Sequence, residues 1–446
     1  MTAIVWFRDD LRLDDHPALA AAARAGGVLP AFVRDAEFRV GGAARWWLHH
    51  ALADLGRRIA DAGGRLAIYD GDAGAALAEA ARAVGAREVH ALAARIPTGR
   101  ATQDAAAARL AADGVRLVLH PGALLHDPAA IRTGAGRPYT VFTPFWRAFA
   151  QTVAPPAAAS APPVRWRADA LGCALADLDL LPAAPDWAGG LREAWTVGEA
   201  AAVARLEDFV GTRLAAYPAD RDRPDRPGTA RLSADLRWGQ LSPARVWRRV
   251  LAETIDPAKE AGAWAFLRQL GWREFAHHVL AAHPHLATRN LRPGFDAFPW
   301  RDAPADLLRW QRGDTGFPFV DAAMRELWTT GWMHNRARMV AASFLVKDLR
   351  IDWRCGLAWF EDTLVDADPA LDPFSWQWVA GSGADAAPYF RIFNPETQGR
   401  KFDPAGDYVA RWLGRRGHAA EPGAIVDHAE ARRAALAAAA VMARVV

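Results

Sequence analysis

A short stretch near the C-terminal end of the chain combines three carboxylates with two tryptophans. Asp366, Asp368 and Asp372 precede Trp376 and Trp378. Carboxylates among so many rings are costly to bury unless a polar or cationic group lies against them. Spacing alone leaves two interpretations open: the acids face a bound cofactor, or they cap the start of a helix over a tryptophan-lined core.

A metal site is a third use for two acids so close together, because a D-x-D pair such as Asp366 and Asp368 can ligate Mg²⁺. No glycine-rich phosphate loop and no further carboxylate cluster accompanies this pair. Four histidines lie upstream, at 277, 278, 283 and 285, without a recognised zinc spacing. We therefore expect no metal.

The composition is that of a soluble globular chain with room for two or three domains, since 52% of its 446 residues are hydrophobic. We find no apolar run that would span a bilayer and no signal-peptide layout, so we expect a cytoplasmic protein. Only Cys173 and Cys355 occur, which excludes a disulfide framework. The net charge is only +3, but arginine greatly outnumbers lysine, which suits contact with phosphates.

The elements that must position these residues begin with an alternation of strands and helices. Short apolar runs predict strands at 3–8, 28–35, 65–70, 88–93 and 115–120. Alanine-rich segments with helical spacing separate them, at 16–25, 44–62, 74–84 and 101–112. This order is typical of a doubly wound α/β domain with a parallel sheet. Neither a G-x-G-x-x-G fingerprint nor a Walker-type loop occurs, so the usual nucleotide-binding modes have no support.

The second half of the chain has helical periodicity throughout. The predicted helices lie at 198–213, 242–254, 260–281, 304–312, 318–330, 334–347, 353–363 and 426–444. Between the two halves, proline- and glycine-rich sequence predicts a long connection over the surface. We therefore predict an α/β domain at 1–125, a connector at 126–196 and a larger all-α domain at 197–446.

Seven motifs spread over nearly the whole chain occur together in one known family. They are VWFRDDLRLDDHPAL at 5–19, PYTVFTPFWRAF at 138–149, GTARLS at 228–233, QLSP at 240–243, LGWREF at 270–275, the segment 316–349 and IDWR at 351–354. Together they resemble the photolyase/cryptochrome family of light-driven FAD proteins, and most closely the microbial photolyases that repair cyclobutane pyrimidine dimers. The resemblance implies a monomer that binds FAD in the helical domain and acts on double-stranded DNA containing a dimer.

The same resemblance implies which residues surround the FAD. Its phosphates and adenosine would be bound by hydroxyls and backbone N–H groups of Tyr217, Thr229, Ala230, Arg231, Leu232 and Ser233. The isoalloxazine would be enclosed by Arg273, Asn335, Arg338, Asp366, Ala367, Asp368 and Asp372. Arg338 paired with Asp366 would offset the buried charge, which explains the acids. Without the family, GTARLS is merely a polar helix cap.

Three tryptophans match the electron-transfer triad of the family. They are Trp376 in W-Q-W, Trp353 in I-D-W-R and Trp300 in F-P-W. Tryptophan is the most easily oxidised of the neutral side chains, and electron tunnelling falls off exponentially with distance, so a buried flavin needs stepping stones to the surface. Each tryptophan alone is typical of a core aromatic. The three together favour a route for electrons.

The substrate side is implied in the same way. A dimer must leave the duplex to reach a flavin, which requires a basic rim for phosphates and an apolar pocket for the flipped bases. By resemblance Trp272 and Trp378 form the pocket walls, and Met339 accommodates a cyclobutane dimer. Gln269, Asn335 and Arg336 would contact the substrate or its phosphates.

Two positions depart from the pattern of dimer-repairing photolyases. Gln269 stands where they usually carry a Glu, and its amide can hydrogen-bond a thymine carbonyl but cannot supply a proton or a negative charge. Asp372 stands where they usually set an Asn against flavin N5, and an acid at this position is a feature that plant cryptochromes also carry. An anionic Asp372 would repel a reduced anionic flavin, whereas a protonated one could hydrogen-bond N5 or hand it a proton.

The predicted function is light-driven DNA repair, in which excited reduced FAD donates an electron to the dimer, the cyclobutane ring splits and the electron returns. The predicted catalytic residues are Trp300, Trp353, Trp376, Gln269 and Asp372. A cryptochrome-like photoreceptor that uses the same FAD and tryptophans for signalling is the alternative. A folate or deazaflavin antenna is left open, because Arg95 alone persists from the family's pattern at 93–104. Binding to DNA would place the protein on the nucleoid.

Overall fold

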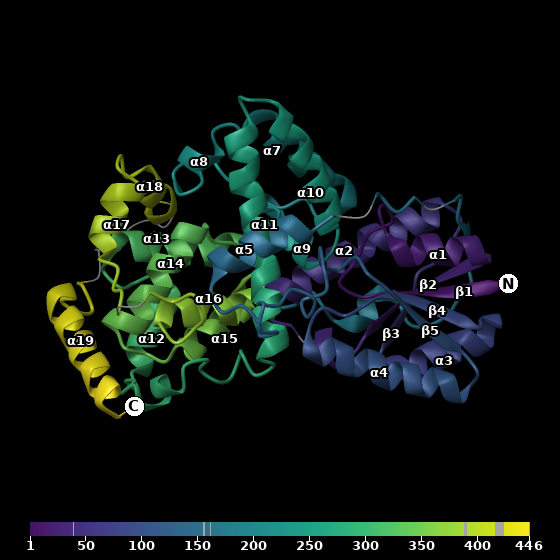
Figure 1. Ribbon diagram of the computed structural model, residues 1–446, viewed down its shortest axis with the longest axis horizontal. Coiled ribbons are helices and arrows are strands. Elements are labelled where there is room, and N and C mark those ends of the chain that lie inside the picture. Colours follow the sequence, from purple (N-terminus) through teal and green to yellow (C-terminus); the bar gives the residue numbers. More distant parts are fainter. Residues whose placement is uncertain (39, 155–156, 161, 388–389, 415–422, 446) are drawn as a thin grey trace.

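A computed structural model describes residues 1–446 except 39, 155–156, 161, 388–389, 415–422 and 446. An α/β domain built around the N-terminus lies beside a larger helical domain that ends at the C-terminus (Figure 1). No helix in the described part of the chain is long and apolar enough to cross a membrane.

The α/β domain is built on a parallel sheet whose strands run in the order β3-β2-β1-β4-β5. Its strands are β1 (Thr2–Phe7), β2 (Gly27–Arg34), β3 (Ala67–Asp70), β4 (Glu88–Leu92) and β5 (Arg116–His120), with β6 (Arg165–Trp166) added beside β2. In register, Ile4 of β1 lies between Leu29 and Val89. The three central strands are almost continuously apolar because both faces of a parallel sheet are covered.

Helices cover the two faces of this sheet. They are α1 (Pro17–Ala25), α2 (Gly42–Asp61), α3 (Ala73–Val84) and α4 (Pro97–Ala112), with the short η1 (Ala36–Phe38) after β2. Leu19 of α1 and Leu48 of α2 pack with Phe7 on one face. Leu77 of α3 and Leu110 of α4 pack with Trp6 on the other. The prediction of a doubly wound α/β domain is therefore confirmed.

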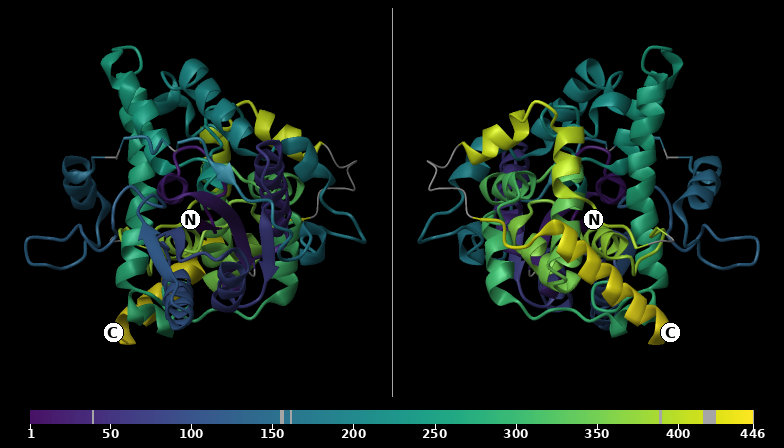
Figure 2. Two further views of the ribbon diagram at one scale, coloured as in Figure 1. Left: turned by 90° about the vertical axis from the view of Figure 1, so that its right-hand side faces the viewer. Right: turned by 90° about the vertical axis from the view of Figure 1, so that its left-hand side faces the viewer.

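The helical domain contains the predicted helices and several shorter ones. They are α7 (Glu199–Thr212), α8 (Tyr217–Asp220), α9 (Ser233–Arg237), α10 (Pro243–Leu251), η3 (Ala252–Ile255), α11 (Glu260–Ala282), η4 (Pro293–Ala297), α12 (Pro304–Arg312), α13 (Pro318–Thr330), α14 (Asn335–Ser343), the π-helix η5 (Phe344–Asp348), α15 (Trp353–Thr363), α16 (Leu371–Ala380), α17 (Pro395–Phe402), α18 (Asp407–Leu413) and α19 (His428–Val445). The long helix α11 packs against α5, α8, α10 and α16 (Figure 1), and α19, yellow in Figure 2, packs across η4 and η5.

The segment predicted as a surface connector contains helices of its own and contributes to the core of the helical domain. It contains α5 (Phe142–Thr152), β6, η2 (Leu175–Leu178) and α6 (Gly189–Ala194). The spacing of Phe142, Phe145 and Phe149 puts all three rings on one face of α5, and they are buried in the core of the helical domain against α11. Composition alone missed this helix, and the limits 1–125, 126–196 and 197–446 stay a prediction.

Candidate functional site

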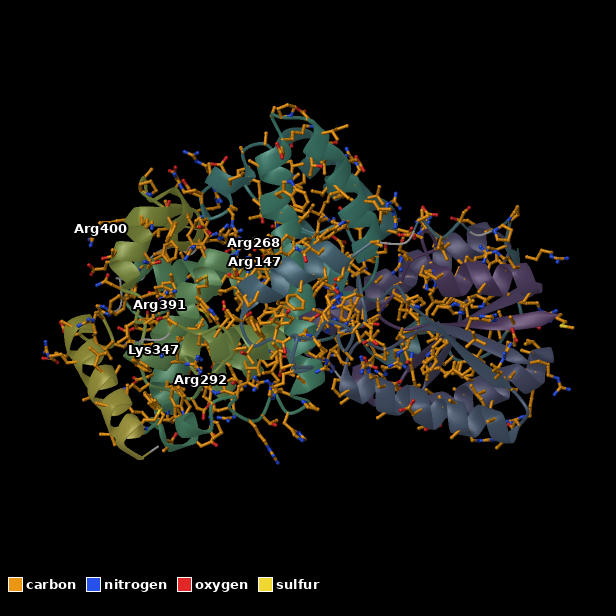
Figure 3. The ribbon with its side chains drawn as sticks, viewed as in Figure 1. Arg147, Arg268, Arg292, Lys347, Arg391 and Arg400 are labelled. Atoms are coloured by element: carbon orange, nitrogen blue, oxygen red, sulfur yellow. The ribbon has the colours of Figure 1, made fainter. Side chains whose placement is uncertain are left out.

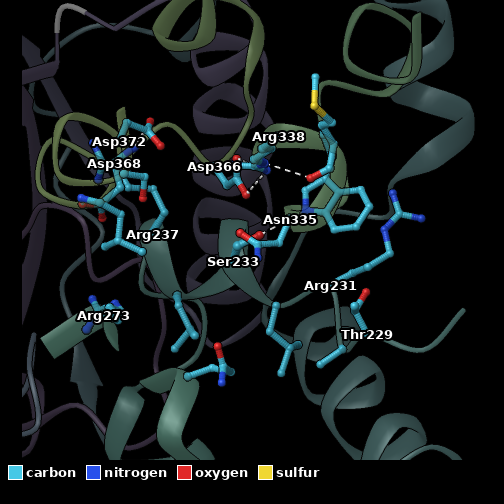
Figure 4. Close-up of a pocket in the computed structure, with 18 of the residues that line it drawn as sticks. Thr229, Arg231, Ser233, Arg237, Arg273, Asn335, Arg338, Asp366, Asp368 and Asp372 are labelled. Carbon is cyan, nitrogen blue, oxygen red and sulfur yellow. Dashed lines mark hydrogen bonds and ion pairs between the residues drawn. The ribbon is translucent and has the colours of Figure 1, made fainter. Parts of the chain in front are cut away.

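A cavity of about 310 Å³ opens in the helical domain between α8, α9, α11, α14 and α16 (Figure 4). Fifteen of the residues singled out in the sequence line it: Tyr217, Thr229, Ala230, Arg231, Leu232, Ser233, Gln269, Arg273, Asn335, Arg338, Met339, Asp366, Asp368, Asp372 and Trp376. Its volume lies in the range of small-molecule and cofactor pockets. The fold thus brings residues far apart in the sequence to one place.

The carboxylates at one end of the cavity are compensated by arginines. Both oxygens of Asp366 accept hydrogen bonds from Arg338 Nη2, at 3.0 and 2.8 Å, and Arg338 Nε donates to the carbonyl of Met333 at 2.8 Å. The predicted pair of Arg338 and Asp366 is therefore present. Although burial disfavours its charge, the neighbouring Asp366 raises the pKa of Arg338, so this cation is fixed in place.

Asp368 and Asp372 lie next to each other but have opposite charge preferences. Burial disfavours the charge of Asp368, but Arg95, His277 and the arginines beyond them hold its pKa well below the usual range. Burial raises the pKa of Asp372 well above its usual range against the pull of Arg338, and the charges of Asp366 and Asp368 add to this rise. The surroundings therefore favour the carboxylate form of Asp368 and the acid form of Asp372.

The other end of the cavity presents a cation and hydroxyl groups. The guanidinium of Arg231 lies between the rings of Trp195 and Trp332, 4.4 and 4.8 Å from their centroids. Among the described residues, Arg231 forms no hydrogen bond and no salt bridge, and its buried Nε has no partner. Its backbone has φ +52, a conformation that non-glycine residues rarely adopt. A half-buried cation that no carboxylate contacts among the described residues, beside the hydroxyls of Thr229 and Ser233, indicates an anionic ligand.

Comparison with known proteins identifies the family. A family model described as the FAD binding domain of DNA photolyase matches residues 266–441, and a model described as DNA photolyase matches residues 3–163. A deoxyribodipyrimidine photo-lyase from Agrobacterium fabrum is 46% identical over 92% of this chain and 86% of its own. This chain belongs to the DNA photolyase family.

Other relatives include both photolyases and cryptochromes. The crystal structure of a bacterial class III photolyase from Agrobacterium tumefaciens superposes with a TM-score of 0.94 at 43% identity, over 99% of this chain and 98% of that one. Cryptochrome-1 of Arabidopsis thaliana is 34% identical over 92% of this chain but only 62% of its own. The resemblance predicted from the motifs is therefore confirmed, and cryptochromes are among the relatives of this photolyase-family chain.

The three tryptophans of the predicted photolyase triad pack in one hydrophobic cluster. Trp376 lines the cavity, is almost fully buried, and its ring lies 4.9 Å from that of Phe360. Trp353 is fully buried and donates from Nε1 to Asn290 at 3.0 Å. Trp300 is half-buried and lies 4.4 Å from Phe298. Trp376 at the cavity wall and Trp353 are thus buried, whereas Trp300 reaches the surface, as a route from cofactor to solvent requires.

The predicted substrate residues are divided between the cavity and the surface next to it. Gln269 accepts a hydrogen bond from Arg221 at 3.2 Å, and Asn335 donates to Met339 Sδ at 3.7 Å. Outside the cavity lining, Trp272 stacks on Phe142 with centroids 3.6 Å apart, and Arg268 covers the same Phe142 ring at 5.3 Å.

Trp378 and Arg336 also lie outside the cavity lining. Trp378 Nε1 donates to Asp385 at 3.0 Å, and the guanidinium of Arg391 lies 5.7 Å from its ring. Arg336 pairs with Asp222 at 3.0 Å and lies 4.3 Å from the ring of Phe402. Ala367, the last predicted cofactor residue, contributes a carbonyl that accepts from Arg237 at 2.8 Å. Of the two tryptophans predicted as pocket walls, Trp378 therefore has a cation near its own ring, whereas Trp272 stacks on Phe142, the ring that Arg268 covers.

Sequence reasoning missed several residues of the cavity, above all Arg237 and Trp332. Arg237 is buried and lies 3.6 Å from Asp9 of the α/β domain, and Trp332 donates from Nε1 to Ser233 at 3.3 Å. Both lie within a few residues of a recognised motif, GTARLS or the segment 316–349, so the neighbourhood of each motif was the available signal.

The antenna stretch at 93–104 needs a correction. Arg95 was expected to remain from an antenna site, but its side chain lies between the two domains, in ion pairs with Asp9 of the α/β domain and Asp368 of the helical domain. A separate cavity of about 950 Å³ lies at the carboxyl ends of β2 and β3, where Thr102 of α4 reaches it. Arg34 and Asp35 are among its polar lining.

Proposed function

We propose that this photolyase-family protein binds FAD in the cavity of its helical domain and uses light to split cyclobutane pyrimidine dimers in double-stranded DNA, as a monomer associated with the nucleoid. The observation that carries the proposal is the division of the cavity into two ends. A half-buried cation without a hydrogen-bonded carboxylate, together with hydroxyls, lies at one end, and three aspartates and Trp376 lie at the other. A dinucleotide with a phosphate half and a polar ring system needs this arrangement.

The side chains fit FAD in chemical type. Arg231, with the hydroxyls of Tyr217, Thr229 and Ser233 and the backbone of Ala230 and Leu232, would hold the diphosphate and adenosine half. The remaining predicted cofactor residues, Arg273, Asn335, Arg338, Asp366, Ala367, Asp368 and Asp372, would enclose the isoalloxazine. When bound, reduced FAD supplies the photoexcitable electron donor for the lesion.

The protein's own contribution is positioning, proton control and exclusion of water. Asp372, as an acid, presents a hydrogen-bond donor without adding negative charge to the cavity. Gln269 donates one amide N–H to the carbonyl of Ala265 and would offer the other to a thymine carbonyl, while Arg221 holds its oxygen. Trp376, Trp353 and Trp300 would conduct electrons between the cavity and solvent.

DNA would bind on the face that carries the exposed arginines (Figure 3). Arg147 and Arg268 lie close together over α5 and α11, and Arg391 and Arg400 lie farther toward the C-terminal helices. Phosphate contacts from such residues supply affinity that does not depend on sequence. Trp272 and Trp378 would then form the walls around the flipped dimer, with Met339 at the cavity mouth and Arg336 and Asn335 on the neighbouring backbone.

The test is repair of a single cyclobutane thymine dimer in a short duplex by chemically reduced protein, under blue light and in the dark. We expect repair only in the light. The matched control is Trp376→Phe, which should fail to photoreduce an oxidised cofactor but should still repair when reduced chemically. Loss of repair in the reduced variant would contradict the role given to Trp376.

One alternative has a specific observation in its favour. The acid form of Asp372 suits a photoreceptor that takes up a proton after light-driven reduction, and cryptochromes are among the relatives of this chain. A protein that photoreduces its flavin fully but repairs no dimer in the assay above would be a cryptochrome-like receptor. The three tryptophans serve both functions, so their substitution does not discriminate.

A second chromophore is proposed only as an accessory. The larger cavity at the carboxyl ends of β2 and β3 lies where open α/β sheets bind ligands, and its walls carry both charges and apolar groups. A folate or deazaflavin there would appear as absorption that persists after FAD is removed. Protein that contains FAD as its sole chromophore when purified from its own host would contradict this part of the proposal.

A further inference from the structure

Arg95 crosses from the α/β domain into the wall of the helical-domain cavity. It follows β4, yet it is only 4% exposed and four of its five N–H groups are engaged. Nε donates to Asp9 at 2.6 Å, and Nη1 donates to Asp368 at 2.7 Å and to His277 Nε2 at 3.0 Å. Nη2 donates to the carbonyl of Arg237 at 3.3 Å. One guanidinium thus joins a loop of the sheet to three elements of the helical domain.

Asp368 connects Arg95 to the start of α16, because one of its carboxylate oxygens binds Arg95 and the other binds backbone N–H groups at the start of the helix. While Oδ2 accepts from Arg95, Oδ1 accepts from the backbone N–H groups of Ala370 and Leu371 at 2.8 and 3.1 Å, which caps the start of the helix. The backbone N–H of Asp368 itself donates to Asp372 Oδ2 at 2.9 Å. Asp368 therefore holds both the helix that carries Trp376 and the side chain of Asp372.

We propose that Arg95 is a positioning residue for the flavin site, which acts from the α/β domain by keeping Asp368 a carboxylate and, through Asp368, by fixing the place and the charge state of Asp372. The proposal rests on the cofactor site proposed above. It gives the α/β domain a direct part in the chemistry of the helical domain, separate from any antenna that it binds.

The charges around Asp372 give the sign of this effect. Arg338 faces it from α14, Arg237 from α9, and Asp366 and Asp368 from the loop before α16. The two carboxylates oppose a third negative charge, so a charged Asp368 favours the acid form of Asp372. Without Arg95, Asp368 would be a buried carboxylate that had lost its nearest cation. Protonation of Asp368 would then cost less free energy than keeping the unpaired charge buried.

The first test is infrared spectroscopy of the FAD-loaded protein and of Arg95→Met near neutral pH. We expect the variant to gain one C=O stretch of a protonated carboxyl group, which disappears in the double variant Arg95→Met with Asp368→Asn. Arg95→Lys should restore the parental spectrum because it restores the charge. The matched control is Asp9→Asn, which removes the other carboxylate on Arg95 and should add no such band.

The second test addresses the step from Asp368 to Asp372. Asp368→Asn keeps a side-chain oxygen for the helix cap but removes the charge, so the C=O band assigned by Asp372→Asn should be lost at a lower pH than in the parent. We also expect Arg95→Met to bind FAD about fivefold more weakly, the size of a weakened helix cap. If Arg95→Met does not fold, Arg95→Gln, which keeps an amide donor near Asp368, should give the same extra band.

Two results would overturn the proposal: an Arg95→Met or Arg95→Gln spectrum equal to that of the parent, or an Asp372 band that titrates at the same pH after Asp368→Asn. Infrared bands report the carboxyl groups whether or not DNA is repaired. A protein that gains the band but repairs no dimer would refute the repair function and keep the role of Arg95.

Discussion

Gly356 of α15 should be intolerant of any side chain, because the ring of Trp376 fills the space where a Cβ would lie. A Cβ at this position would stand 2.6 Å from Trp376 Cζ3 and 2.6 Å from Leu345 Cδ2, and closer still to Trp376 Cη2. Ordinary contacts begin at 3.4 Å, so the ring would have to retreat from α15 by roughly 0.8 Å or more. Trp376 is 2% exposed, which leaves it no free space except the cavity.

The expected cost of Gly356→Ala combines two opposing effects. Alanine in place of glycine within a helix is worth about 1 kcal/mol of stability. Overpacking a dense core costs about 1–3 kcal/mol, and here the added methyl group would clash with two side chains, Trp376 and Leu345. We therefore expect a net loss of up to about 2 kcal/mol in the free energy of unfolding, together with displacement of Trp376 toward the cofactor.

Gly211 of α7 provides the matched control. A Cβ there would meet no atom within 4 Å, so Gly211→Ala should be neutral or slightly stabilising. Denaturant unfolding gives the stability of each variant, and the initial rate of flavin photoreduction at constant light reports the position of Trp376. The reasoning would be refuted by a Gly356→Ala protein that is as stable as Gly211→Ala and photoreduces at the parental rate.

Three further predictions concern other parts of the site. Asp366→Asn should lower the free energy of unfolding by about 3 kcal/mol, because Arg338 would be left without its counter-ion; equal denaturation midpoints would contradict this. Burial raises the pKa of Glu326 to about 7 despite the hydrogen bond from Tyr408, so its contribution to stability is present below pH 4.5 and lost as pH rises through 7. The stability of the parent relative to Glu326→Gln should therefore fall across that interval by about 3 kcal/mol, and parallel pH profiles would show that Glu326 does not titrate as proposed. Trp300→Phe should slow photoreduction while chemically reduced protein repairs at the parental rate, and unchanged photoreduction would exclude Trp300 from the route.

The α/β domain could be predicted almost in full from the sequence. Its strands alternate with alanine-rich helices, and a parallel sheet covered on both faces needs exactly such apolar runs, so each predicted element lies within a few residues of the observed one. The connector was harder. Phe142, Phe145 and Phe149 carry a helical pattern, but they lie between proline- and glycine-rich segments whose composition suggested a loop.

Short helices of the second domain were missed for a different reason. Helix α16 contains Pro373 and a mixture of acids and rings with no clear apolar stripe, and it begins where Asp368 caps it. Its stability comes from that cap and from packing against α11, α14 and α15, which a local pattern does not contain. The motifs nevertheless identified this segment as part of the site.

The residues that line the cavity could be predicted from the motifs, whereas the charge states of its acids could not. Residues that line it were recognisable because they lie in GTARLS, in LGWREF or around Asp366. The opposite charge preferences of Asp368 and Asp372 depend on Arg237, which lies far from them in the sequence, and on Arg95, which reaches the site only through the packing of the two domains. Sequence spacing contains no information on such contacts.

Repair of a defined thymine dimer tests the central claim most directly. Chemically reduced protein would be mixed with excess duplex that carries one dimer, exposed to blue light, and the restored thymines counted against a sample kept in the dark. The account predicts that each protein molecule restores many dimers in the light and none in the dark. Intact dimers in both samples, with FAD bound and reduced, would contradict it.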